Sequence, residues 1–139
     1  MGQHFQLHPL IVHFPLALFI TALGMEALCL ISKKEALRQA AYYNYLLGTL
    51  GGIAAVLAAW WDGQVLEHPI FYTHKTLAYW TAGLALACAL ILFLVKQRKS
   101  KKVFRIIFFT FLILTAVLVS LTGYYGGRLV YEYGVGVEE

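Results

Sequence analysis

The chain has 139 residues, of which 60% are hydrophobic and 13% are charged, and its formal net charge is +4. Soluble domains average about 25% charged residues, and a water-soluble fold of this length has too little interior to bury so much apolar surface. The composition therefore excludes an ordinary soluble domain and predicts an integral membrane protein.

Four predominantly apolar stretches follow one another along the chain, each close to the ~20 residues that cross a ~30 Å hydrocarbon layer. We place membrane-spanning helices at about 9–31, 42–61, 76–95 and 103–125. No basic residue precedes the first stretch and no small-residue cleavage site follows it, so we expect it to stay as a helix rather than serve as a signal peptide. The sequence predicts one all-α domain, a four-helix transmembrane bundle in a lipid bilayer.

Basic residues cluster in the first and third connections between these helices. They are Lys33, Lys34, Arg38, Lys96, Arg98, Lys99, Lys101 and Lys102. The positive-inside rule places both connections in the cytoplasm, so a protein of the bacterial cytoplasmic (inner) membrane would have periplasmic N- and C-termini. Topology thus explains the net charge, and we expect no nucleic-acid partner.

Two histidines mark the start of the first helix, in the segment HPLIVHFP. Pro9 suits the first turn of a helix, which puts His8 at the helix entrance and His13 about one turn inside the apolar layer. An imidazole at the depth of His13 needs a ligand or a hydrogen-bonding partner, because little water is available there.

The first helix also carries Glu26, the one acid within a predicted span. Its angle around the helix matches that of His8, because a separation of about 18 residues is about five whole turns. We expect its carboxylate to snorkel to Lys33 or Lys34, or to bond to a neighbouring helix. A part in a proton path is the alternative.

The third helix opens with THKTLAYW, which places His74 at nearly the same depth as His13. Small side chains lie below both histidines on their helical faces. Two neutral imidazoles at equal depth on facing helices are the ligands that a b-type haem needs. Lys75, Arg128 and Tyr131 would then receive the haem propionates.

Two other interpretations of the histidines stay open. His8, His13, His68 and His74 offer imidazoles suited to a copper or zinc site. Alternatively, the rings bond to helix carbonyls, to each other or to Asp62 and only hold the helix ends together, in which case no cofactor is bound.

The segment after the fourth helix, GGRLVYEYGVGVEE, is too short to cross a membrane and is rich in glycine. We therefore expect residues 126–139 to form a tail that folds back over the outer mouth of the bundle. Arg128 would pair with Glu132 four residues on, or with Asp62 or Glu67 of the second connection.

Residues for the common enzyme chemistries are not recognisable in the sequence. We find no nucleophile with its base, no phosphate-binding loop and no carboxylate pair set for acid–base work, so we expect an electron carrier or a subunit rather than an enzyme. Cys29 and Cys88 both fall within apolar stretches without a metal-ligand spacing, and we expect them to be buried thiols.

The opening HPLIVHFP, the His74–Lys75 pair and the closing GGRLVYEYGVGV resemble a bacterial family of predicted four-helix membrane proteins, domain of unknown function 2231, over essentially the whole chain. Its signature is HPxxVHFP at the start and GGxLVYxxGVGV at the end. Relatives joined to Rieske iron–sulfur or cytochrome c modules imply electron transfer. The residues matched to the family pattern are His8, Pro9, His13, Phe14, Pro15, His74, Gly126, Gly127, Tyr131 and Gly134. Tyr133 stands where many relatives have histidine, so a site that needs a ligand there would be incomplete.

From the residues and the resemblance together we expect a membrane-embedded, b-type cytochrome-like protein with His13 and His74 as axial ligands. It would pass electrons at the outer face of the membrane, to or from other redox proteins. The alternatives are a structural or assembly subunit of a larger membrane complex without a cofactor, and a histidine metal-binding membrane protein. The sequence leaves open whether the chain forms a homo-oligomer.

Overall fold

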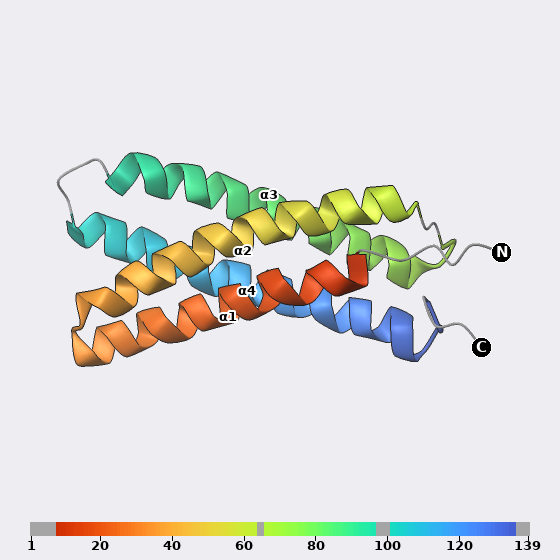
Figure 1. Ribbon diagram of the computed structural model, residues 1–139, viewed down its shortest axis with the longest axis horizontal. Helices are drawn as coiled ribbons and strands as arrows, with labels where there is room; N and C mark the ends of the chain where they lie inside the picture. Colours follow the sequence, from red (N-terminus) through yellow and green to blue (C-terminus); the bar gives the residue numbers. More distant parts are fainter. Residues whose placement is uncertain (1–7, 64–65, 97–100, 136–139) are drawn as a thin grey trace.

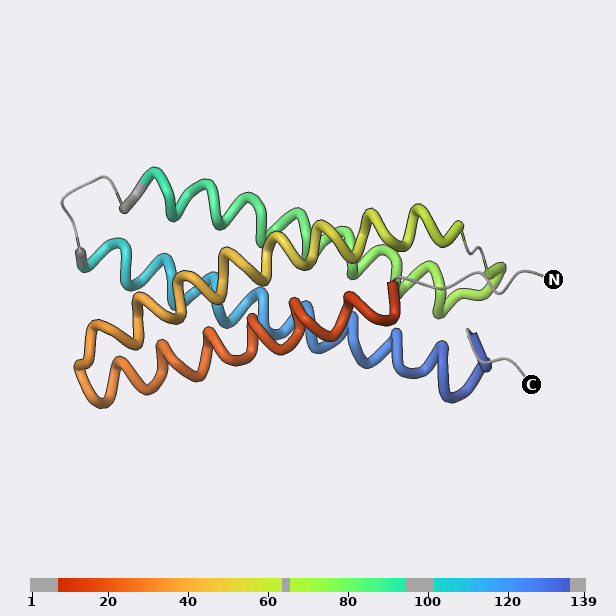
Figure 2. The backbone as a smooth tube through the Cα atoms, in the orientation of Figure 1, coloured from red at the N-terminus to blue at the C-terminus, as the bar shows by residue number. Residues whose placement is uncertain are grey.

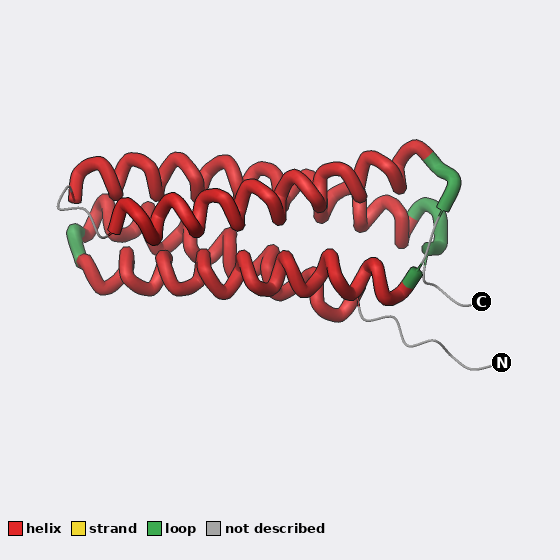
Figure 3. The backbone as a smooth tube through the Cα atoms, turned by 90° about the horizontal axis from the view of Figure 1, so that it is seen from above, coloured by secondary structure: helices red, strands yellow, loops and turns green. Residues whose placement is uncertain are grey.

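The protein is a bundle of four α-helices, seen in a computed structural model that describes residues 8–63, 66–96 and 101–135. The helices are α1 (His8–Ser32), α2 (Glu35–Asp62), α3 (Pro69–Lys96) and α4 (Lys101–Tyr131). Each is long and apolar enough to cross a membrane. The predicted all-α, four-helix transmembrane fold is confirmed, and the described residues contain no strand, as Figure 3 shows.

The four helices run up, down, up and down as two hairpins (Figures 1 and 2). Helix α1 packs most extensively on α2, and α3 packs most extensively on α4, while α1–α4 and α2–α3 contacts join the two hairpins. The start of α1 and the end of α4 lie at one end of the bundle, which we call the terminal end. The α1–α2 connection lies at the opposite end, which we call the basic end.

Three helix boundaries differ from the sequence prediction by six or seven residues. Helix α3 begins at Pro69 rather than near residue 76. Helix α2 begins at Glu35 rather than near residue 42, because residues 35–41 are mostly strong helix formers and a glutamate stands in the first turn. Helix α4 continues to Tyr131, so residues 126–131 of the expected tail are helical. The chain turns only beyond it, where Gly134 adopts a φ of 63° and the N–H of Val135 donates to the carbonyl of Leu129.

Some predicted features lie outside the described residues. Arg98 and Lys99 of the third connection and residues 136–139 of the expected tail belong to this group.

Aromatic rings and small side chains share the core between the hairpins. Tyr45 and Phe108 are fully buried, with ring centroids 6.0 Å apart. Gly48 lets α2 approach α1 closely, since a Cβ there would lie 3.0 Å from Cε1 of Phe19. Large apolar side chains also cover the outside of the bundle, as expected where lipid is the solvent.

Candidate functional site

Two histidine side chains meet inside the terminal end of the bundle. His8 opens α1 and His74 lies in the second turn of α3, and both side chains are half-buried. Their ring centroids are 6.1 Å apart and their ring planes are inclined at 79°. We call His8 and His74 the histidine pair.

Each ring of the histidine pair is held by a carbonyl of the next helix along the chain. Nδ1–H of His8 donates to the carbonyl oxygen of Ala55 at 2.8 Å, and Nδ1–H of His74 donates to the carbonyl oxygen of Thr122 at 3.0 Å. Because a carbonyl can only accept, the proton of each neutral ring is on Nδ1. Nε2 then carries the lone pair, which is the arrangement of a histidine that binds a metal through Nε2.

The two hairpins repeat the same arrangement. In each one, a histidine near the start of the first helix bonds to a carbonyl of the second helix, at separations of 47 and 48 residues. Because α1 and α3 run in the same direction, the two rings enter the bundle from the same end. The histidine pair therefore joins equivalent positions of the two hairpins.

The start of α1 is also tied to the end of α2. The backbone N–H of His8 donates to Oδ2 of Asp62 at 2.8 Å. This carboxylate satisfies an amide that has no partner within its own helix, and its negative charge suits a helix N-terminus. We considered Asp62 as one possible partner for the imidazoles. In the structure its carboxylate accepts from the backbone N–H of His8, and this bond fixes where His8 enters the bundle.

His13 lies on the outside of α1, apart from the histidine pair. Its side chain is exposed, and Nδ1–H donates to the carbonyl of Pro9 in its own helix at 2.9 Å. Five residues at about 100° each place His13 roughly 140° around the helix from His8, so the two cannot face the same way. In the structure His8 lies beside His74, in the position that we expected His13 to have.

The remaining predicted ligands lie at the surface of the terminal end. The ring of His68 packs on Tyr133, with centroids 4.4 Å apart, and its Nδ1 accepts from the backbone N–H of Ile70. Tyr131 is 90% exposed. The Nζ of Lys75 lies 6.0 Å from the ring centroid of Tyr79.

Arg128 is engaged within α4. Its Nη2 lies 2.7 Å from Oε2 of Glu132, which confirms the predicted pair four residues apart. Its guanidinium also lies over the ring of Tyr124, 5.9 Å from the centroid. Any anionic group that Arg128 received would have to compete with Glu132.

Comparison with known proteins fixes the family of this chain. Residues 4–139 match the family described as predicted membrane protein (DUF2231). The chain belongs to the DUF2231 family. No curated protein and no solved structure matches it. The family resemblance drawn from the two terminal motifs is thereby confirmed, and the histidine of the opening motif that reaches the core of this DUF2231 protein is His8.

Polar side chains continue into the core of the DUF2231 bundle below the histidine pair. Oγ1 of Thr81 lies 3.1 Å from Oγ1 of Thr122, and the hydroxyl of Tyr45 lies 3.1 Å from Oγ1 of Thr115. These bonds link α3 to α4 and α2 to α4. Such hydrogen bonds hold helices together in lipid, where each polar group needs a partner.

Towards the basic end, the DUF2231 bundle contains a buried ion pair between α1 and α2. Glu26 is fully buried, and Arg38, which is 5% exposed, holds its carboxylate through Nε at 2.9 Å and Nη2 at 2.8 Å. We expected Glu26 to snorkel to Lys33 or Lys34 or to bond to a neighbouring helix, and the second of these is confirmed. Arg38 takes this role because α2 begins at Glu35, which carries Arg38 into the core.

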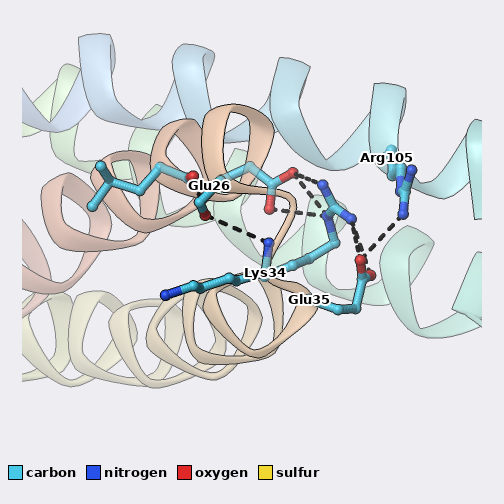
Figure 4. Close-up of polar contacts among 7 residues, drawn as sticks. Glu26, Lys34, Glu35 and Arg105 are labelled. Atoms are coloured by element: carbon cyan, nitrogen blue, oxygen red, sulfur yellow. Dashed lines mark hydrogen bonds and ion pairs between the residues drawn. The ribbon is translucent and has the colours of Figure 1, made fainter.

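A chain of alternating charges leads from this pair to the surface. Arg38 also bonds to Glu35 at 2.8 Å, and Arg105 of α4 bonds to Glu35 at 3.1 Å. Figure 4 shows Glu26, Glu35 and Arg105 along this chain. It ties the first hairpin to α4 at the basic end, as the histidine pair connects the hairpins at the other.

The histidine pair offers two nitrogen ligands. Within the described ranges, no group of three or more histidine, cysteine, aspartate or glutamate side chains is placed to hold a metal ion. Structural zinc sites need four protein ligands and catalytic ones need three. The histidine pair alone therefore provides fewer ligands than either kind of zinc site needs.

Proposed function

We propose that this DUF2231 protein is a membrane-embedded electron carrier that binds one b-type haem between His8 and His74. The proposal places the terminal end on the outer side of a bacterial cytoplasmic membrane, because the exposed cations Lys33, Lys34 and Lys102 lie at the basic end. Electrons would then be exchanged with redox proteins on the outer side.

The geometry of the histidine pair carries the proposal. Two metal–nitrogen bonds of about 2 Å, with about 1 Å from each nitrogen to its ring centroid, put the centroids of two axial imidazoles about 6 Å apart. The observed separation is 6.1 Å.

The residues of this chain would tune the cofactor in a defined way. A haem supplies a one-electron couple, and the protein sets its potential through the axial ligands, their hydrogen bonds and the surrounding dielectric. The carbonyls of Ala55 and Thr122 make the imidazoles of His8 and His74 more basic and fix their orientation.

The structural-subunit interpretation is the second candidate, because the two histidine–carbonyl bonds already satisfy one nitrogen of each ring without any cofactor. In that case the histidine pair would only hold the two hairpins together, and the protein would bind partner subunits rather than a cofactor. A copper or zinc ion would need further ligands beyond the histidine pair.

Visible spectra of the purified protein from haem-supplied cells, oxidised and dithionite-reduced, distinguish these functions. We expect a sharp reduced α-band that His8→Ala and His74→Ala abolish. His13→Ala is the matched control and should retain the band, because His13 faces outward. A featureless wild-type spectrum would rule out the haem protein, and loss of the band in His13→Ala alone would return the ligand role to His13.

A further inference from the structure

The carbonyls that hold the histidine pair share a local feature. In an α-helix the carbonyl of residue i accepts the N–H of residue i+4, and the Cα–Cβ bond of residue i+4 leans back over that carbonyl. A ring from another helix therefore has more room to reach the carbonyl where residue i+4 is small. His74 bonds to the carbonyl of Thr122, four residues before Gly126. His8 bonds to that of Ala55, four residues before Ala59.

The ring of His74 lies close to the backbone of Gly126. A Cβ built on this residue would lie 3.0 Å from Cε1 and 3.2 Å from Nδ1 of His74. The hydrogen bond from Nδ1 to the carbonyl oxygen of Thr122 is already 3.0 Å long. Moving the ring away by a few tenths of an ångström would lengthen this hydrogen bond to the point where it is weak.

The backbone does not require glycine at this position. Gly126 lies within α4, and its φ is not positive. Glycine is also a poorer helix former than alanine. Its neighbour Gly127 shares the same helix, but a Cβ there would meet no atom within 4 Å. The two glycines thus differ in one respect, the contact with His74.

We propose that Gly126 is a positioning residue for His74. Because Gly126 has no side chain, the carbonyl of Thr122 stays accessible to the imidazole of His74. The hydrogen bond to this carbonyl keeps the proton on Nδ1 and leaves the Nε2 lone pair for a ligand. Ala59 has the same place in the first hairpin with respect to His8. The consequence for a haem rests on the proposed function, whereas the position of the proton can be measured without any cofactor.

Nuclear magnetic resonance of cofactor-free protein labelled with ¹⁵N-histidine, at a pH about two units above the usual histidine pKa of about 6.5, tests the proposal. The His74 signals are assigned by their loss in His74→Ala. We expect wild-type His74 to be protonated at Nδ1. Gly126→Ala should shift population to the Nε2–H tautomer, and Gly126→Val should shift more of it.

The matched control is Gly127→Ala, which gains the same helix propensity and should keep the wild-type tautomer. Far-ultraviolet circular dichroism and size-exclusion elution select the folded variants, and Gly126→Ala carries the test alone where Gly126→Val does not fold. An Nε2–H tautomer in wild type would overturn the proposal. A Gly126→Ala tautomer equal to that of Gly127→Ala would overturn it as well.

The two proposals fail separately. If wild type binds no haem but the tautomer moves as described, the positioning role of Gly126 stands and the cytochrome does not. If haem binds and Gly126→Ala changes neither the tautomer nor the haem spectrum, the cytochrome stands and the positioning role does not.

Discussion

The carboxylate of Glu26 and the guanidinium of Arg38 form a buried ion pair between α1 and α2, with Nη2 2.8 Å from Oε1. The pair depends on a tight connection. Helix α1 ends at Ser32, Lys33 follows with a φ of 56°, and α2 begins at Glu35. Two charges thus meet inside an apolar bundle only 12 residues apart along the chain.

Breaking this pair should strongly destabilise the bundle. Removing one partner leaves an uncompensated buried charge, so Arg38→Met is expected to cost about 3–5 kcal/mol of unfolding free energy, and adding Glu26→Gln should recover part of that loss. Reversible unfolding in detergent measures both. Glu35→Gln is the control, because Glu35 is 55% exposed and should contribute no more than about 1 kcal/mol. Equal losses in Arg38→Met and Glu35→Gln would contradict the assigned burial.

Close packing of α1 on α2 should be sensitive to one methyl group. In Gly48→Ala the new Cβ meets the ring of Phe19 at 3.0 Å, and such overpacking typically costs about 1–3 kcal/mol. Gly52→Ala adds the same group where no atom lies within 4 Å and should be neutral or stabilising by up to about 1 kcal/mol. Thermal unfolding of the two variants compares them directly. The packing would be incorrect if Gly48→Ala unfolded at a higher temperature than Gly52→Ala.

The Tyr45–Thr115 hydrogen bond should couple α2 to α4. Both side chains are fully buried. A double-mutant cycle of Tyr45→Phe and Thr115→Val is expected to give a coupling energy of about 0.6 kcal/mol, typical of hydrogen bonds between membrane helices. Strictly additive losses would show that the two hydroxyls do not interact.

Acid should break the Arg128–Glu132 ion pair. The Arg128 side chain, which hydrogen-bonds to Glu132, lowers the pKa of that carboxyl below its usual 4.5. Because the folded pKa is depressed, the pair is fully formed above about pH 4.5 and is lost as the pH falls through the lower folded value. A titration of the Glu132 carboxyl by nuclear magnetic resonance should show this lowered pKa, and Arg128→Ala should raise it towards 4.5. An unchanged pKa in that variant would contradict the pairing.

The fold was predictable because hydrophobic length decides it. Each span is long and apolar enough to be recognised without any contact between helices. The starts of the helices were less predictable, since charged residues at a helix end lower the local hydropathy. Arg38 was therefore assigned to a loop, although the helix formers around it favoured an earlier start for α2.

The histidine pair was only half predictable. The sequence indicated His74 together with His13, because the two were expected at a similar depth in the membrane. The position around the helix axis determines which histidine faces the core. Glu26 has the same helical angle as His8, and the structure places Glu26 in the core. That common angle was the signal in the sequence that pointed to His8. We expected the fourth helix to end before Gly126 because glycine lowers helix propensity, whereas the contact of Gly126 with His74 shows only in three dimensions.

Electron paramagnetic resonance of the oxidised, haem-loaded protein tests the central claim most directly. Near-perpendicular axial imidazoles, as the 79° between the ring planes implies, should give a highly anisotropic low-spin ferric signal, with one haem per chain. His8→Ala and His74→Ala should each remove it, and His13→Ala should leave it in place. A preparation without a low-spin ferric signal, or a signal that persists in His8→Ala, would contradict a haem held between His8 and His74.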